Sequence, residues 1–593
     1  MARLPTVGGD DGTWGTILNE FLEVSLDTDG KLKNMPLNVK DYGATGDGTT
    51  DDSTAINNAI TAAGAAGGNI VFVPEGTYIV QDITMRSNVI LRGAGRGSIL
   101  KLKDNTTADV IKSPAINPST VISYAGVEDL TIDGNKANQS DGVDLQQYGL
   151  ALNGAADSWA RNVWVHDTQR SGIYLAGERL TVEDCQVEAI GKVGAGGSII
   201  GRSGIVCSNF TGFTAGGMIV RNNRVLDCLE HGIKLYPGND GSVVEGNYVL
   251  TAEERGIYIQ GGNYVTVTGN TVNGAAVVGI FIGDGTDAGV GNAVGDNTIN
   301  GITGSGAHGI LCWNQFGGQV TGNGVTNCTG NGIYLLSCPG FTLTGNRCHN
   351  NGSSGGYSGI KLYESPNSAV VGNICSNNGT TGSRGAGIYL TDAGGTATTN
   401  CSIVGNICYD TASGGSKKQA YGVLTDELSD YITVDGNTLR DNFTAETSLV
   451  GTHNVTAVRQ STVIGPFYVN DLQATASPQM NLGFFNSATA MSQAAVDPEV
   501  DRSGRVIGLT IVSDDARTSG TCNAYVRIDG VGSVFAANAV VLNGTHTTDS
   551  MKNVNYDSGL PFTAGQRLGI DLDTSGWGPT TANIIGWLTI AFD

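Results

Sequence analysis

The stretch HGIKL at residues 231–235 decides the fold, because its glycine followed by alternating apolar residues returns along most of the chain. A second pattern, seen as VVEGNYV at residues 243–249, keeps pace with the first and carries a Gly-Asn pair. Repeats of two such short strands bury too little surface alone and must stack on their neighbours. The sequence therefore predicts parallel strands stacked about 4.8 Å apart around a continuous core. Further copies of the first pattern are YGLAL at 148–152, SGIYL at 171–175, SGIVC at 203–207, RGIYI at 255–259, VGIFI at 278–282, HGILC at 308–312, NGIYL at 331–335, SGIKL at 358–362 and AGIYL at 386–390.

The asparagine of the second pattern is predicted to occupy a corner of each repeat. Asparagine tolerates the left-handed backbone conformation and bonds to nearby main chain, so a stacked column of asparagines is interpreted as structural. Cys348, Cys375 and Cys408 each stand two residues after such an asparagine, where other copies have an inward apolar residue. They are expected to be small buried hydrophobic residues, with disulfides as the alternative. The asparagines stand at positions 223, 247, 270, 297, 323, 346, 373, 406 and 437.

The composition agrees with an elongated repeat. Glycine accounts for 89 of the 593 residues but proline for only 13, which suits many tight corners between short strands. The formal net charge is −22, and this charge repels phosphate backbones, so no nucleic-acid partner is expected. The sequence has neither a long apolar run nor a secretory pattern at its start, so we expect no membrane insertion and no export by a signal peptide.

The segment before the repeats, residues 38–80, predicts a short helix followed by a strand. Asp52 or Ser53 can cap a helix that has Ile56, Ala59, Ile60 and Ala63 on one face, and NIVFVP at 69–74 follows as a strand. The segment reads VKDYGATGDGTTDD, then VFVPEGTY, and resembles the N-terminal signature of pectate-lyase-superfamily right-handed β-helices. That family includes phage tailspikes, polysaccharide lyases, polygalacturonase relatives and alginate epimerases. The resemblance implies an all-β fold, a right-handed parallel β-helix with an N-terminal capping helix, and leaves the reaction open.

Three domains are expected. Residues 1–35 contain a candidate amphipathic helix with Ile17, Phe21 and Val24 on one face, and resemble the attachment segment of a phage tail appendage. Residues 36–464 form the β-helix. Residues 465–593 replace the glycine repeat by alternating strands, which predicts a jelly-roll-like β-sandwich. In tailspike-like proteins such a module trimerises the chain or binds glycans, and the resemblance implies either role.

The residue between the isoleucine and the leucine of each copy is predicted to face outward. Down the repeats this column is rich in aromatic residues and lysines, which can stack on sugar rings and meet acidic groups of a glycan. Two alternatives remain open: strands favour aromatic residues on any exposed face, or the strip is a contact between subunits. The candidate substrate-binding residues are Lys234, Tyr236, Arg255, Tyr258, Phe281, Trp313, Tyr334 and Lys361.

Glu230 and Glu254 hold equivalent places in neighbouring copies, so their backbones are expected about 4.8 Å apart. Glycoside hydrolysis requires such a pair of carboxylates, and Asp284 offers a further base. A lyase would use His231 or Lys234 as the base, with Arg255 beside the sugar carboxylate. A solvated turn carboxylate is the alternative for each glutamate.

His308 in AHGI is similar to the Gly-His-Gly element of polygalacturonases. The acidic elements of polygalacturonases and the Tyr-Gly-x-Asp-Pro-His-Glu element of alginate epimerases are not found in this sequence. The candidate catalytic residues, Glu230, His231, Glu254, Asp284 and His308, therefore come from position in the repeat and not from a shared motif.

No cofactor is expected, with Ca²⁺ as the alternative at the acidic loops 27–30, 46–52 and 283–289, which lack the spacing of a calcium-binding loop. The resemblance implies a phage tailspike or tail fibre, a homotrimer joined through its N-terminus to a tail or baseplate protein. It would act outside the cell at the host surface, where it binds and depolymerises a bacterial surface polysaccharide. The alternatives are a non-catalytic receptor-binding or structural fibre, and a free polysaccharide lyase, hydrolase or epimerase.

Overall fold

The computed structural model divides the chain into two compact units, Met1–Val455 and Thr456–Asp593. In the first unit and across its boundary the structure describes residues 12–25, 35–114, 121–139, 147–192, 202–209, 213, 216–286, 288–392, 394, 397–450 and 454–456. In the second it describes residues 461–469, 479–482, 504–513, 522–528, 540–542, 550–562, 566–573 and 584–592.

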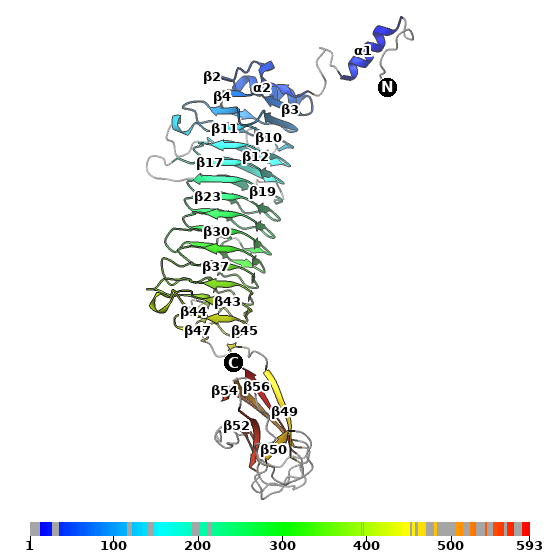
Figure 1. Ribbon diagram of the computed structural model, residues 1–593. Coiled ribbons are helices and arrows are strands. Elements are labelled where there is room, and N and C mark those ends of the chain that lie inside the picture. The colour runs from blue at the N-terminus through cyan, green and yellow to red at the C-terminus, as the bar shows by residue number, and fades with distance from the viewer. Residues whose placement is uncertain are drawn as a thin grey trace. The chain divides into compact units, whose positions relative to one another are not determined.

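The first unit is a stack of coils whose strands form three long parallel sheets, visible as successive arrows in Figure 1. The sequence pattern predicts two strands per repeat, whereas most coils have three. The reason is that the Gly-Asn pair is a corner, which divides the second pattern into a strand of the first sheet and a strand of the second. In one coil these are β22 (Val243–Glu245) and β23 (Tyr248–Ala252), followed in the third sheet by β24 (Arg255–Ile259).

The first and second sheets have 16 and 15 strands and meet at the Gly-Asn corners. The first contains β1 (Leu37–Asn38), β3 (Asn69–Val73), β6 (Val89–Gly93), β10 (Gly126–Glu128), β13 (Trp159–Arg161), β16 (Thr181–Glu183), β19 (Ile219–Arg221), β22, β25 (Thr266–Thr268), β29 (Ala293–Gly295), β33 (Gln319–Thr321), β36 (Thr342–Thr344), β39 (Ala369–Val371), β42 (Ser402–Val404), β45 (Thr433–Asp435) and β48 (Val455–Thr456). The second contains β2 (Asp47–Asp51), β4 (Gly76–Val80), β7 (Ser98–Leu102), β11 (Thr131–Asp133), β14 (Trp164–His166), β17 (Gln186–Ile190), β20 (Arg224–Cys228), β23, β26 (Thr271–Asn273), β30 (Thr298–Asn300), β34 (Gly324–Thr326), β37 (Arg347–His349), β40 (Ile374–Ser376), β43 (Ile407–Tyr409) and β46 (Thr438–Arg440).

The third sheet, with 15 strands, carries the HGIKL pattern and the candidate site. Its strands are β5 (Ile83–Thr84), β8 (Ile111–Lys112), β9 (Ile122–Ser123), β12 (Leu150–Ala156), β15 (Ile173–Glu178), β18 (Ile205–Ser208), β21 (Ile233–Leu235), β24, β27 (Val278–Ile282), β31 (His308–Trp313), β35 (Ile333–Leu336), β38 (Ile360–Tyr363), β41 (Gly385–Thr391), β44 (Gln419–Thr425) and β47 (Ala445–Ser448). A short pair, β28 (Gly289–Val290) and β32 (Gln315–Phe316), lies outside the three sheets.

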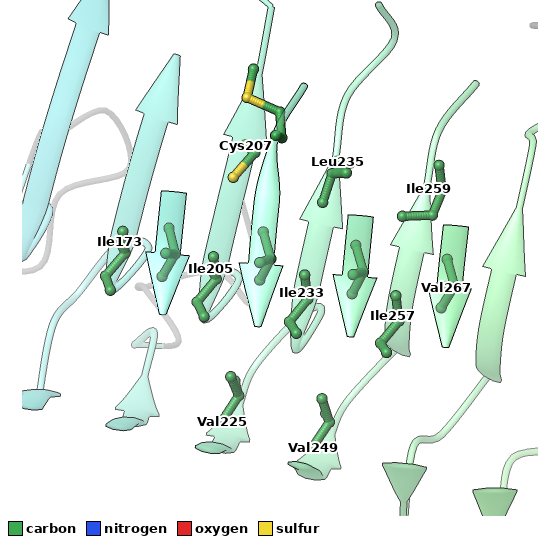
Figure 2. Packing of buried hydrophobic residues seen from close by; sticks show 14 of the residues in the cluster. Ile173, Ile205, Cys207, Val225, Ile233, Leu235, Val249, Ile257, Ile259 and Val267 are labelled. Atoms are coloured by element: carbon green, nitrogen blue, oxygen red, sulfur yellow. The ribbon is translucent and has the colours of Figure 1, made fainter. Parts of the chain in front are cut away.

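The core of the stack is made by the apolar residues of the repeat. Ile233 and Leu235 are fully buried, as the alternation predicts. Figure 2 shows the equivalent isoleucines in successive places on neighbouring strands. The preceding glycine is required by close packing, because a Cβ on Gly256 would lie 2.3 Å from Val272 Cγ1 and 2.7 Å from the carbonyl oxygen of Gly279. The repeated glycine and isoleucine therefore serve the scaffold.

The asparagines of the corners form a continuous buried ladder. The Asn247 Nδ2 donates a hydrogen bond to Asn270 Oδ1 at 2.9 Å, and the same bond recurs between the next asparagines along the stack. The left-handed conformation lies one residue earlier than the sequence predicts, as at Gly246 with φ 63° and Asp296 with φ 53°. The residue before each asparagine makes the turn, and this frees the asparagine side chain to bond from coil to coil.

The cysteines behave as buried apolar residues. Cys348, Cys375 and Cys408 are aligned on adjacent strands of the second sheet and have no exposed surface. The ten cysteines whose side chains are described are all free and buried, so none of these ten forms a disulfide.

Helix α1 (Trp14–Ser25) precedes the stack, and helix α2 (Ser53–Ala65) lies between its strands β2 and β3. The α2 helix buries Ile56, Ala59, Ile60 and Ala63, the face that the sequence predicts. Asp52 stands at its N-cap but does not cap it, because its carboxylate accepts hydrogen bonds from the amides of residues 45 and 46 instead. Helix α1 covers the predicted amphipathic segment, although the side chains of Phe21 and Val24 lie outside the described residues. Over the described ranges, neither helix has the length and apolar character needed to span a bilayer.

The second unit is antiparallel and all-β, which agrees with the predicted C-terminal module. Eight strands follow the order β53-β52-β55-β50-β49-β56-β51-β54. The edge strands β53 and β54 approach each other, so the sheet folds over on itself. The strands are β49 (Ser461–Val469), β50 (Gln479–Leu482), β51 (Gly504–Ser513), β52 (Cys522–Ile528), β53 (Val540–Leu542), β54 (Ser550–Phe562), β55 (Leu568–Asp573) and β56 (Ile584–Phe592).

Candidate functional site

The outer face of the third sheet carries the column of side chains that the sequence predicts. The strand registers align Lys234 with Tyr258 and Tyr258 with Phe281. The column continues across β31 to Tyr334 and then Lys361. Because alternate residues of a strand point to opposite faces, these side chains lie outside the core of the stack.

Outward orientation does not make all of these side chains accessible. Tyr258 is 6% exposed and Phe281 is 4% exposed. Their rings stack with centroids 5.1 Å apart, and the Arg255 guanidinium lies 4.6 Å from the Tyr258 centroid. Trp313 stacks beside Phe281 at 6.5 Å and is itself 37% exposed. Tyr258 and Phe281 therefore support their neighbours and offer little surface to a ligand, whereas Trp313 is the more exposed of the three side chains.

Lys234 is 9% exposed although it carries a charge. Its Nζ lies 4.1 Å from the ring centroid of Tyr236 and 5.3 Å from that of Tyr258. Among the described residues it makes no ion pair, so the aromatic rings are its observed electrostatic partners. A buried ammonium without a carboxylate partner is costly, and such a cost is typical of functional positions.

Glu230, His231 and Glu254 form a compact cluster where the chain enters β21 and β24. The Glu254 amide donates to the Glu230 carbonyl oxygen at 2.9 Å, so the two glutamates lie on adjacent coils as predicted. One carboxylate oxygen from each glutamate and one ring nitrogen of His231 lie within 4.8 Å of one another. The Glu230 side chain is 17% exposed and the Glu254 side chain 45% exposed, so both are open to a molecule on the outer face.

Both carboxylates are held by neighbouring donors. Glu230 Oε2 accepts hydrogen bonds from the Arg202 amide at 2.8 Å and from Ser203 Oγ at 3.2 Å. Glu254 Oε2 forms an ion pair with Arg255 Nη1 at 3.0 Å. Since the donors of Glu230 belong to the preceding coil and the donor of Glu254 to its own, the glutamates are fixed independently of each other.

His231 is 1% exposed and lies between the two carboxylates. Its Nε2 is 3.6 Å from Glu230 Oε1 and its Nδ1 is 3.7 Å from Glu254 Oε2, both longer than a hydrogen bond. Burial, with smaller contributions from Lys234 and Arg255, lowers the pKa of His231 to about 2. The carboxylates of Glu230 and Glu254 favour the protonated ring, but neither forms a hydrogen bond to it. The effect of burial on the pKa therefore outweighs theirs. The imidazole is therefore neutral, and it is a weak base for a lyase reaction.

A second group of polar and aromatic side chains lies on the same face, three coils and roughly 14 Å from His231. His308 Nδ1 accepts a hydrogen bond from the Asn331 amide at 3.0 Å, and its ring packs edge-on against Tyr334 at 5.0 Å. Burial, and then Lys361, lowers the pKa of His308 to about 4. The Lys361 Nζ lies 5.5 Å from the Tyr334 centroid. The structure thus places His308, Tyr334 and Lys361 together, apart from the glutamates.

Asp284 also lies away from the glutamates. It follows the end of β27, whereas Glu254 precedes the start of β24, so roughly 20 Å of strand separates the two positions. Its carboxylate accepts hydrogen bonds from Gln260 Nε2 at 3.0 Å and from the Thr286 amide at 2.9 Å. This placement does not bring Asp284 to the glutamate pair as a further base.

Sequence reasoning missed Arg202, Ser203 and Tyr357, although each contacts a predicted site residue. Arg202 and Ser203 hold Glu230, and the Tyr357 ring packs edge-on against His308 at 6.0 Å. The repeat contains the signal for the first two, because Arg202 stands two residues before its glycine, as Glu230 does one copy later. Tyr357, in the connection before β38, likewise stands two residues before a repeat glycine, Gly359.

The acidic loops are described in part. The loop at 27–30 lies outside the described residues. In the loop at 46–52, Asp47 accepts hydrogen bonds from the amides of Thr49 and Thr50, both at 2.8 Å. These bonds lower the pKa of Asp47 well below its usual range. The absence of a cofactor stays the prediction, with a calcium ion at these loops as the alternative.

Family comparisons cover most of the first unit. Residues 37–281 match the family described as rhamnogalacturonase A/epimerase, pectate lyase-like, and residues 288–466 match the right-handed beta helix region. Together with the three parallel sheets, these matches define residues 37–281 as a pectate-lyase-like domain and residues 288–466 as a right-handed β-helix region. The expected fold is confirmed.

Two groups of individual proteins are similar to this chain. Mannuronan C5-epimerase AlgE6 of Azotobacter vinelandii is 44% identical over 122 residues, which are 18% of this chain and 14% of the epimerase. The preneck appendage protein of Bacillus phage PZA is 25% identical over 236 residues, 38% of this chain and 26% of that protein. The solved N-terminal fragment of bacteriophage phi29 gene product 12 has a TM-score of 0.53 at 16% identity, and the match covers 73% of this chain and 74% of the fragment. The chain spans a small part of the epimerase and of the phage PZA protein, so the similarity to each protein is limited to the matched segment.

Proposed function

We propose that this protein is a tailspike-like or tail-fibre-like phage protein that binds a bacterial surface polysaccharide on the outer face of the third sheet and depolymerises it. Similarity to a phage appendage protein and to polysaccharide epimerases supports this proposal. It would belong to the virion tail and act outside the cell at the host surface. Residues 1–35 would attach it to a tail or baseplate protein, and the C-terminal module would hold a homotrimer or bind glycan.

The observation that carries the cleavage step is the approach of two carboxylates from adjacent coils. An oxygen of Glu230 and an oxygen of Glu254 lie within 4.8 Å of each other, on the face where a glycan would lie. Retaining glycoside hydrolases place their two carboxyl groups about 5 Å apart, one as nucleophile and one as proton donor. Glu230, held by two donors and less exposed, is proposed as the nucleophile. The more exposed Glu254 is proposed to give and take the proton, because water must reach it in the second step.

Substrate binding is proposed to use side chains on the same face as the glutamates, some beside them and some on later coils. Trp313 offers an exposed ring on which a sugar can stack, and Tyr236 is partly exposed beside Lys234. Lys234 and Lys361, cradled by aromatic rings, would meet acidic groups of the glycan. These positions span several coils of one face, as an extended polysaccharide requires.

The test is a chain-length assay of purified protein on host capsule or exopolysaccharide, with products analysed by mass. We expect shortened oligosaccharides that carry added water, and a loss of at least about a hundredfold in rate for Glu230→Gln and for Glu254→Gln. Glu253→Gln is the matched control, because Glu253 is exposed and next in sequence. Unsaturated products would assign a lyase instead, and a polysaccharide that is bound but never shortened would assign the non-catalytic fibre.

A further inference from the structure

We propose that Glu230, His231 and Glu254 form a binding site for a divalent transition-metal ion such as Zn²⁺. The proposal goes beyond the proposed function and does not depend on polysaccharide cleavage. It rests on the spacing of the three side chains and on a buried ring nitrogen of His231 that lacks a partner.

The spacing fits metal ligands better than it fits hydrogen bonds. Zinc bonds of about 2.1 Å in a tetrahedral arrangement place the ligand atoms about 3.4 Å from one another. The His231 Nδ1 lies 3.7 Å from Glu254 Oε2, a distance too long for a hydrogen bond and close to the ligand spacing. One atom from each of the three residues lies within 4.8 Å of the others, so a single ion can reach all three after small side-chain rotations.

The second observation is independent of the two acids. His231 is 1% exposed, and its Nδ1 has no hydrogen-bond partner among the described residues although it faces Glu254. A buried polar nitrogen normally has a hydrogen-bond partner, and one without a partner is a suitable place for an ion or a water molecule. A metal ion at this place would coordinate the ring nitrogen and neutralise the two carboxylates that flank the ring.

The donor set indicates which metal. Imidazole nitrogen with carboxylate oxygen suits Zn²⁺, Mn²⁺ or Co²⁺, whereas Ca²⁺ takes six to eight oxygen ligands. Three protein ligands leave one tetrahedral position for water. Arg255 already pairs with Glu254 at 3.0 Å and would compete with the metal for that carboxylate, so an affinity in the micromolar range is expected.

A second acid and histidine cluster provides an internal control. Asp133, His166 and Asp167 also place three possible ligand atoms within 4.8 Å of one another. His166 differs from His231, because its Nδ1 contacts Asp167 Oδ2 at 2.9 Å and its side chain is 19% exposed. The second cluster therefore lacks the buried orphan nitrogen, and no metal is assigned to it.

The experiment titrates ZnCl₂ into full-length protein stripped with a chelator, by calorimetry and by metal analysis after equilibrium dialysis. We expect one Zn²⁺ per chain, with affinity reduced at least tenfold in His231→Gln and in Glu254→Gln. His166→Gln and Glu253→Gln should leave the binding unchanged. The Glu254 side chain is 45% exposed, so its variant should fold even where His231→Gln fails to fold.

Three results would overturn the proposal: no Zn²⁺ bound at millimolar concentration, an affinity unchanged in Glu254→Gln, or binding lost in His166→Gln. These readouts are separate from the cleavage assay. A protein that binds Zn²⁺ but cuts no polysaccharide refutes only the proposed function, and a protein that cuts polysaccharide but binds no Zn²⁺ refutes only the metal site.

Discussion

Removing one amide from the asparagine ladder should open the β-helix locally. Asn297 Nδ2 donates to the Val267 carbonyl and to Asn323 Oδ1, and Asn297 Oδ1 accepts from the Asn270 amide and side chain, each at 2.9 Å. Asn297→Ala removes these bonds inside a corner where Asn297 is only 1% exposed. The Asn270 amide then has no acceptor and no access to water.

The magnitude follows from these contacts. An orphaned buried amide costs about 2 kcal/mol, and the other lost bonds add about 1 kcal/mol net, because the Asn270 side chain keeps its bond to the Val244 carbonyl. A total of about 3 kcal/mol corresponds to roughly a hundredfold increase in local opening. The matched control is Asn273→Ala, since Asn273 is only half-buried and accepts one hydrogen bond, from Asn300 Nδ2 at 3.1 Å. That change should cost less than about 1 kcal/mol.

Hydrogen exchange measured by mass spectrometry on peptides covering residues 266–275 reports this opening, because exchange follows the free energy of local unfolding. We expect roughly hundredfold faster exchange in Asn297→Ala and less than fivefold in Asn273→Ala. Equal exchange in the two variants, or no change in Asn297→Ala, would refute the view that the buried ladder joins the coils.

Three further predictions concern charge, metal and ligand. Burial raises the pKa of Asp109 to about 6, so the stability gained from its protonated form is present below about pH 4 and lost as pH rises through 6. Asp109→Asn keeps an oxygen that can accept hydrogen bonds from the amides of residues 147 and 148. We expect it to raise the free energy of unfolding by up to about 3 kcal/mol at pH 7.5 and to leave it unchanged at pH 4. Denaturant unfolding at the two pH values measures this difference. An equal effect at both would contradict this. If both proposals hold, Zn²⁺ should inhibit polysaccharide cleavage reversibly, and a chelator should restore the activity. The control variant His166→Gln should be inhibited like the wild type. An unchanged cleavage rate with bound Zn²⁺ would show that the metal does not bind the two carboxylates that carry out cleavage. Trp313→Ala should weaken glycan binding roughly tenfold in a binding titration. The control variant Tyr264→Ala removes an exposed ring beside the first sheet and should leave glycan binding unchanged. Equal losses of affinity in the two variants would argue that the glycan does not bind on the third sheet.

Much of the scaffold follows from the sequence because its rules are local and repeated. The alternation around Ile233 predicts which side chains enter the core, and the spacing of the copies predicts that Glu230 and Glu254 meet on adjacent coils. The same pattern predicts two strands per copy, since a two-residue corner such as Gly246 and Asn247 does not interrupt the alternation enough to be read as a turn.

The site was predicted less completely, because accessibility depends on neighbours that the repeat does not specify. Tyr258 and Phe281 face outward as predicted, yet each covers the other and Arg255 lies over both. Asp284 shares the acidic character of Glu254 but lies at the opposite end of its strand. Tyr357 stands two residues before Gly359, as Glu230 does before Gly232, but its partner His308 lies two coils away, and the repeat does not specify contacts over that distance.

The asparagine ladder has a consequence for how such a protein changes in length. Each corner bonds to the next through the same amide group, so a duplicated coil would find the same partners above and below as the original. Insertions and deletions of one whole coil should therefore be tolerated far better than those of a few residues. In evolutionary terms, the distance between the glutamate cluster and the last coil is adjustable only in steps of about 4.8 Å.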